Sequence, residues 1–269
     1  MLVQTWSDAD GGVAVCATTG LNVVRSAGRT IFRVAKTTHG PLNPPPRQDA
    51  GDPSRWSRWD TPGRTIYGGS TAVGAFVEVL EYIDPDPPQI PMTELFDDVD
   101  SSDALTFDAQ IASELPRHGA MPYRSISQGW RRVRNLYELR LPAEGWFVDI
   151  TGADSISVID RELSALMSRC AVGRLTLSEL TDSSDQQKML TTGIATWIRD
   201  TVMLDDGSRP HGIVYPSKWG STLQNWAMWL RRTDDETGPD PVTVVEASDI
   251  GRHTAPFVNA AQLRRMTFF

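Results

Sequence analysis

The chain has 269 residues, a net charge of −8 at pH 7 and a pI near 5.0. This length is enough for one large domain with a buried core, and the acidic balance argues against broad binding to the phosphate backbone of DNA or RNA. The sequence has no apolar run of about 18 residues that could span a membrane, and it lacks the basic start and apolar centre of a secretory signal. Its two cysteines, Cys16 and Cys170, form neither a metal-ligand spacing nor a disulfide framework. We therefore expect a cytoplasmic protein, and the alternative is an effector that is secreted by a route without a signal peptide.

The N-terminal part of the chain predicts a strand followed by a long loop. Residues 1–28 are typical of a leader, to which the sequence assigns no role, and residues 31–34 predict a first strand that carries Arg33. Residues 40–59 are rich in Pro, Gly, Asp and Ser and predict a long loop. Long loops in compact domains often bind ligands, and the tryptophans of this loop favour an ordered conformation.

The next stretch predicts a turn, a strand and an amphipathic helix in quick succession. The Pro-Gly pair at 62–63 is a strong turn signal, and residues 64–67 predict a short strand that ends in Tyr67. Ser70 or Thr71 can cap the helix that follows. Apolar residues recur in this helix at helical spacing and make its buried stripe: Val73, Phe76, Val77, Leu80 and Ile83.

Glu78 lies away from this apolar stripe, one turn after Gly74 and close to Ala75. These small neighbours would let a ligand approach the carboxylate. The alternative is a solvated Glu on the exposed face of the helix, where most Glu side chains lie. Because Arg58 and Tyr67 stand just before this helix, the whole stretch suits a small anionic ligand.

The second half of the chain predicts further strands and helices. Residues 212–215 predict a buried strand that delivers Ser217 to its C-terminal end, and sites are often built where strands end. Residues 225–230 form a Trp-rich segment. The other predicted elements are strands at 136–141, 146–150 and 242–245 and helices at 109–114, 159–167 and 187–204. Since no Gly-rich phosphate loop occurs, we expect a mixed α/β domain of the α+β class with insertions, and not a doubly wound sheet.

The common catalytic motifs are missing from the sequence. The four histidines, His39, His118, His211 and His253, are isolated, and neither HExxH nor CxxC occurs, so no metal site is expected. A nucleophile elbow, a Walker A loop and a dinucleotide fingerprint are missing as well. What remains is a set of Arg, Tyr, Glu and Ser residues at the ends of predicted elements.

These residues resemble the motifs of the RES-domain family, which is named for an Arg, a Glu and a Ser. Members carry Gly-Arg-Trp-Asn, then Pro-Gly, then a Tyr that ends a strand, then a helix with Ala-x-x-Glu, and later Gly-apolar-x-Tyr/Phe-Pro-Ser. The matching segments are 32–34 (FRV), 58–63 (RWDTPG), 66–67 (IY), 75–80 (AFVEVL) and 212–217 (GIVYPS). The chain departs from the pattern at Ser57 and Asp60, and its interval from Gly63 to Tyr67 is one residue short.

The resemblance implies a fold similar to that of ADP-ribosyltransferases, with a core of two packed small sheets flanked by helices. It also implies an enzyme that cleaves the nicotinamide–ribose bond of NAD by hydrolysis or phosphorolysis, with NAD as the substrate and no cofactor. Many members are toxins that are paired with an antitoxin. On this pattern the catalytic domain is 29–250, with an insertion around 85–205, and 251–269 is a C-terminal tail.

The resemblance assigns a role to each matching residue. Arg58 is the first candidate to bind a phosphate of NAD and Arg33 the second, since an Arg fork binds phosphate through two hydrogen bonds. Tyr67 is expected to stack on the nicotinamide. Glu78 would hold a ribose hydroxyl and stabilise an oxocarbenium-like state. Ser217 would bind the ribose or a phosphate, because no neighbouring base supports a role as nucleophile.

Two other functions remain open. The first is transfer of ADP-ribose to a macromolecule, although transferases often carry an acidic residue two positions before the catalytic Glu, where this chain has Phe76. The second is a catalytically silent binding module with the same fold. The expected partners are NAD and a cognate antitoxin that covers the cleft between Arg58 and Glu78, without nucleic acid or membrane. The sequence leaves a homo-oligomer open.

Overall fold

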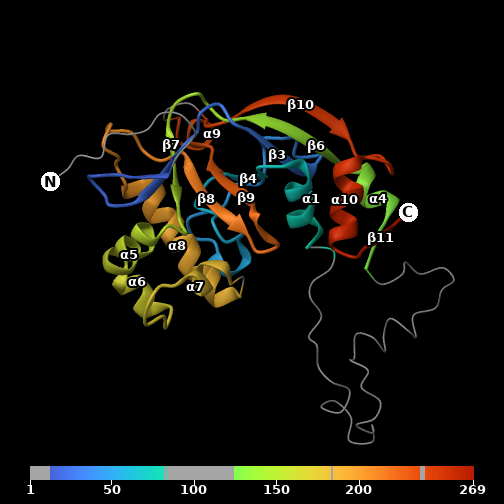
Figure 1. Cartoon of the computed structure of the whole chain (residues 1–269). Helices are drawn as coiled ribbons and strands as arrows, with labels where there is room; N and C mark the ends of the chain where they lie inside the picture. The colour runs from blue at the N-terminus through green and yellow to red at the C-terminus, as the bar shows by residue number, and fades with distance from the viewer. Residues whose placement is uncertain (1–12, 82, 84–123, 183, 237–239) are drawn as a thin grey trace, which may run out of the picture.

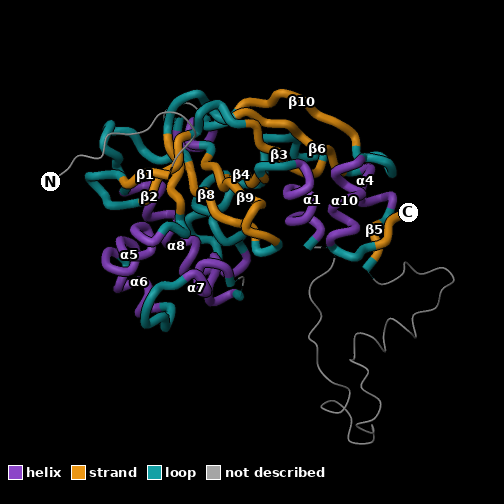
Figure 2. Tube along the Cα trace, in the orientation of Figure 1, coloured by secondary structure: helices purple, strands orange, loops and turns teal. Residues whose placement is uncertain are grey.

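The structure is a computed structural model that describes residues 13–81, 83, 124–182, 184–236 and 240–269. The strands of this part form a large curled mixed sheet and a small parallel pair, and helices cover the outside of the curl (Figures 1 and 2). The chain is therefore a mixed α+β protein, as the sequence predicts. In the described part, no helix is long and apolar enough to cross a membrane. The helix expected at 109–114 lies outside the described residues, as does the start of the expected leader.

The nine-stranded sheet has the order β1-β2-β7-β8-β9-β4-β3-β6-β10, and only β7 and β8 are parallel neighbours. Its strands are β1 (Val13–Val15), β2 (Asn22–Arg25), β3 (Thr30–Lys36), β4 (Thr65–Gly69), β6 (Arg134–Arg140), β7 (Trp146–Asp149), β8 (Gly212–Ser217), β9 (Gly220–Trp229) and β10 (Thr243–Asp249). The short strands β5 (Ser125–Ile126) and β11 (Thr267–Phe268) pair in parallel. The expected leader thus contributes two strands at one edge, and the expected insertion contributes β6 and β7.

Each face of the curled sheet has its own apolar core, because side chains alternate between the faces along a strand. The inner face is filled by residues such as Ile31, Phe147 and Trp226. On the outer face, α5 to α8 pack over β2, β7 and β8, whereas α1 and α10 pack over β3 (Figure 2). The helices are η1 (Pro53–Arg55), α1 (Ala72–Leu80), α4 (Gln128–Arg132), α5 (Ala153–Glu162), α6 (Ser164–Arg169), α7 (Leu177–Thr181), α8 (Asp185–Thr201), α9 (Arg231–Asp235) and α10 (Ala255–Leu263).

Most predicted elements are confirmed, and the differences have physical reasons. The helix predicted at 159–167 is broken at Leu163, where α5 ends and α6 begins. The helix predicted at 187–204 is α8, which ends at Thr201. The Trp-rich segment is part of the long strand β9, which the sequence did not predict. Residues 225–229 are buried on both faces of the sheet, so the segment lacks the alternation that marks a strand with one exposed face.

Helix α1 has the predicted cap and the predicted buried stripe. The Thr71 side chain accepts a hydrogen bond from the Gly74 N–H at 3.0 Å, which satisfies one of the free donors at the helix start. Phe76 packs against Phe257 of α10, with their ring centroids 5.6 Å apart. The expected C-terminal tail therefore contains α10 and β11, and it holds α1 in place on the sheet.

Candidate functional site

The candidate site lies where α1 faces the ends of β8 and β9. The carboxylate oxygen Oε1 of Glu78 accepts hydrogen bonds from Ser217 Oγ at 2.5 Å and from Asn225 Nδ2 at 2.9 Å. Ser217 Oγ in turn accepts a hydrogen bond from the Trp219 N–H at 3.0 Å. Ser217 and Asn225 are buried, whereas Glu78 is partly exposed. The fold thus joins two predicted site residues that are 139 positions apart in the sequence.

Gly69 allows this contact, because it lets α1 lie close to the sheet. A Cβ atom at Gly69 would lie 2.8 Å from the backbone nitrogen of Ala75, which real side chains do not tolerate. Gly69 is also the register partner of Asn225 in the pairing of β4 with β9. Glu78 lies one turn after Ala75 on α1, so its side chain can reach the Asn225 amide on the neighbouring strand β9.

In the described part of the chain, the second oxygen of the Glu78 carboxylate, Oε2, has no hydrogen-bond donor. Both donors bind Oε1. The two donors are a hydroxyl and an amide, and neither carries a positive charge. The carboxylate is therefore fixed in position but not neutralised, which is the arrangement needed to stabilise a positive charge that develops in a bound ligand.

The turn after Ser217 is attached to the protein on two sides. Lys218 Nζ lies 2.5 Å from Glu81 Oε1, one turn beyond Glu78 on α1. The Arg264 guanidinium carbon lies 3.5 Å from the centroid of the Trp219 ring. These contacts hold the rim of the site against α1 and against the end of α10.

Arg58 lies on the same face of the sheet as the Glu78 site and binds the C-terminal end of α7. Its Nη1 donates hydrogen bonds to the carbonyl oxygens of Leu180 at 3.0 Å and Thr181 at 2.9 Å, the last two residues of α7. A cation at a helix C-terminus is favourable. The guanidinium also lies 5.4 Å from the centroid of the Tyr215 ring, and Tyr215 is the register partner of Asn225. In the described part, no hydrogen bond joins Arg58 to Glu78.

The Tyr67 hydroxyl is bound to Asp60. It donates to Asp60 Oδ1 at 2.7 Å and accepts from the Trp59 N–H at 3.1 Å. Asp60 is buried, and its other oxygen accepts from Arg47 Nε at 2.7 Å and from the Ser57 N–H at 3.0 Å. The two positions at which the chain departs from the family pattern, 57 and 60, therefore bind each other and fix the loop before β4.

Arg33 lies on the other face of the sheet from Glu78. It is the register partner of Tyr137, and its neighbours Phe32 and Val34 point toward α1, so its own side chain points into the curl. Its Nη1 donates to the backbone carbonyl of Tyr67 at 3.1 Å. Desolvation lowers the pKa of its guanidinium to about 10. The structure thus brings Arg33 to the backbone of β4, and not to the carboxylate.

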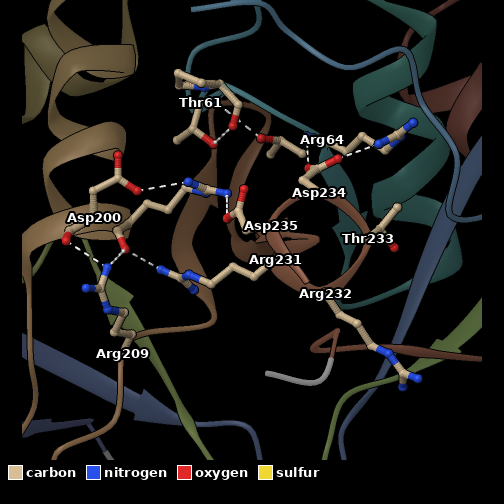
Figure 3. Close-up of polar contacts among 12 residues, drawn as sticks. Thr61, Arg64, Asp200, Arg209, Arg231, Arg232, Thr233, Asp234 and Asp235 are labelled. Atoms are coloured by element: carbon tan, nitrogen blue, oxygen red, sulfur yellow. Dashed lines mark hydrogen bonds and ion pairs between the residues drawn. The ribbon is translucent and has the colours of Figure 1, made fainter. Parts of the chain in front are cut away.

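A second polar cluster lies at the start of β4, whereas the Glu78 site borders its end, and we call this cluster the Arg–Asp network (Figure 3). Its members are Arg64, Arg199, Arg209, Arg231, Asp200, Asp234 and Asp235. Each of its three carboxylates pairs with a guanidinium: Asp234 with Arg64, and both Asp200 and Asp235 with Arg199. Arg209 and Arg231 donate to backbone carbonyls at the end of α8. Part of the network lines an open cleft of about 430 Å³.

Among the described residues that line this cleft, Arg47, Arg199, Asp200, Asp234 and Asp235 each belong to an ion pair. Desolvation, followed by the charges of Arg199 and Arg209, lowers the pKa of Arg231 to about 10. The network joins α8, α9 and the loop before β4, so we interpret it as a structural joint. Within the described ranges, no group of three or more His, Cys, Asp and Glu side chains could hold a metal ion.

Asn225 is the site residue that the sequence reading missed. The signal was present, since Asn225 is the first residue of the buried stretch 225–229, in which the other residues are apolar. A single amide in such a run must find a partner.

The chain was compared with models of protein families, with curated protein sequences and with solved structures, and no match was found in any of the three.

Proposed function

We propose that this chain is an enzyme that consumes NAD by cleaving its nicotinamide–ribose bond, with a fold and site of the RES type. The observation that carries the proposal is the Glu78 carboxylate, which neutral donors fix through one oxygen while no described residue donates to the other oxygen. The motif order supports the same function, since Glu78 and Ser217 are two of the three residues for which the RES family is named. The curled sheet supports a relation to the two-sheet core, because its inner core lies between its two curled halves.

In the proposed reaction the bond between the ribose carbon and the nicotinamide nitrogen breaks, and nicotinamide leaves with the bonding electron pair. The positive charge that develops on the ribose is stabilised by the Glu78 carboxylate, whose open oxygen also accepts a hydrogen bond from a ribose hydroxyl. Water or phosphate then adds to the ribose carbon and loses a proton. Nicotinamide is a good leaving group, so positioning and one carboxylate supply the catalysis.

The other site residues bind the substrate in this proposal. Arg58 uses Nη1 for α7, and its Nε and Nη2 donate to no other described residue, so they are free for a phosphate. Tyr67 presents its ring to the nicotinamide while Asp60 holds its hydroxyl. Arg33 acts from the inner face by holding the backbone of β4. We further propose that the enzyme is a cytoplasmic toxin and that its antitoxin covers the site.

The experiment is to incubate the purified protein with NAD labelled in the adenylate part, with and without phosphate and with a mixture of proteins. Free ADP-ribose indicates hydrolysis, and a phosphorylated ADP-ribose that forms only with phosphate indicates phosphorolysis. Label on a macromolecule would indicate transfer, which the buried Phe76 at the position of the usual acidic residue disfavours. Binding of NAD without any product would support the silent binding module and refute the proposal.

A further inference from the structure

We infer that Asn225 is a positioning residue that orients the Glu78 carboxylate so that its second oxygen faces the substrate. The inference rests on the proposed NAD cleavage and adds a residue that the motifs do not contain. It starts from one contact, the hydrogen bond from Asn225 Nδ2 to Glu78 Oε1 at 2.9 Å.

Asn225 lies on a strand that is paired on both sides. It is buried in the centre of β9, where it pairs in register with Tyr215 of β8 on one side and with Gly69 of β4 on the other. An Asn side chain has few rotatable bonds, and its position here is fixed by two flanking strands. Glu78, by contrast, is a partly exposed side chain on a helix surface. The strand therefore determines where the carboxylate lies.

The chemistry of the two donors separates their roles. Ser217 donates from the strand end, next to the turn that carries Lys218 and Trp219, where a substrate can replace or join its contact. Asn225 contacts the carboxylate from the middle of β9, between two neighbouring strands. Because both donors bind Oε1, rotation of the carboxylate would break both hydrogen bonds, so Oε2 is held toward the open side. An amide does this without a charge, and a Lys or Arg at position 225 would neutralise the carboxylate.

The activity test uses two substitutions of similar size. Asn225→Leu removes the donor, and we expect kcat for nicotinamide release to fall about 10- to 100-fold with KM nearly unchanged, since the amide acts through Glu78. Asn225→Asp replaces the donor by an acid that can donate only when it is protonated. Its activity relative to wild type should therefore rise about tenfold from about pH 8 to about pH 5, because at high pH two adjacent carboxylates repel each other. Gln224→Leu, which removes an exposed amide on the other face of β9, is the control and should keep wild-type kinetics.

A second measurement does not depend on turnover. Melting temperatures are compared for wild type, Asn225→Leu, Glu78→Leu and the double variant. We expect Asn225→Leu to lower the melting temperature by at least about 3 °C more in the wild-type background than in the Glu78→Leu background. Only in the wild-type background does a carboxylate lose its donor.

The outcomes separate this inference from the proposed function. Additive melting temperatures, or wild-type kcat in Asn225→Leu, would overturn the positioning role. If Asn225→Leu does not fold, the isosteric variant Asn225→Asp provides the test. A profile of activity against pH that runs parallel to that of wild type would then overturn the positioning role. A wild-type protein that shows the coupling but releases no nicotinamide would instead overturn the proposed function.

Discussion

The Glu78 site and the Arg–Asp network both hold carboxylates, but they hold them in opposite ways. In the network, Asp234 pairs with Arg64, and Asp200 and Asp235 share Arg199, so each carboxylate contacts a guanidinium (Figure 3). At the site, Glu78 is held by the hydroxyl of Ser217 and the amide of Asn225. Paired charges stabilise the structure, but their electric fields largely cancel, so they act only weakly on a ligand. Neutral donors fix the carboxylate equally well and leave its charge available.

The difference matters for function because a neutralised carboxylate cannot stabilise a new cation. Preorganised charge acts on a reaction only if it is not already compensated by the protein. On this ground we propose Glu78 as the site of the reaction, although an open cleft of about 430 Å³ lies beside the network. The comparison predicts that changes in the network alter stability, whereas changes at the site alter turnover.

The largest effect on stability is expected from Arg199→Met. The Met side chain keeps much of the packing of the arginine stem, but two ion pairs to the half-exposed carboxylates of Asp200 and Asp235 are lost, so we expect the free energy of unfolding to fall by about 2 kcal/mol. Nicotinamide release per folded molecule should not change. Chemical denaturation measures the first quantity. The control is Arg161→Met, which breaks the exposed pair with Glu162 and should cost less than about 0.5 kcal/mol. Equal losses in the two variants would contradict a structural role for the network.

A smaller loss of stability, together with a loss of turnover, is expected from Gly69→Ala. The new Cβ meets the backbone of α1 at Ala75, so α1 must move, at a cost of about 1.5 kcal/mol. Because Glu78 moves with the helix, kcat should fall as well. Gly173→Ala is the matched control, since a Cβ there meets no atom within 4 Å. Turnover at the wild-type level in Gly69→Ala would mean that the site does not depend on the close approach of α1.

The smallest expected effect is on the pH dependence of stability, through His211, which lies close to Arg231 of the network. Burial, followed by the charge of Arg231, lowers the pKa of His211 below its usual 6.5. The unfolded chain therefore binds a proton at His211 at a pH where the folded protein does not, so stability falls as the pH drops below about 6.5. The slope of unfolding free energy against pH in this range should be smaller in His211→Gln. An unchanged slope would assign the pH dependence to other groups.

Much of the fold could be predicted from the sequence because local patterns determine it. Helix α1 follows from its cap at Thr71 and its apolar stripe, and β8 follows from an apolar run that ends at Ser217. The strand β9 could not be predicted, because burial on both faces removes the alternation of polar and apolar residues. The break at Leu163 between α5 and α6 likewise has no Gly or Pro to mark it.

The candidate site could be predicted only in part, because its contacts span the chain. The order of motifs led to Glu78 and Ser217, which meet in the structure. The position of Arg58 depends on carbonyl groups of α7 about 120 residues later, and no local pattern contains that information. The inward direction of Arg33 follows from strand alternation, which becomes informative only when the faces of the sheet are known.

The most direct test of the central claim compares Glu78→Gln with Asp235→Asn, two substitutions that each convert one carboxylate to an amide. Nicotinamide release from NAD and the melting temperature are measured for both variants and for wild type. We predict that Glu78→Gln loses about 100- to 1000-fold in turnover while its melting temperature stays near that of wild type, and that Asp235→Asn melts earlier while its turnover is unchanged. Folded wild-type protein that releases no nicotinamide, or a Glu78→Gln variant with wild-type turnover, would contradict the claim.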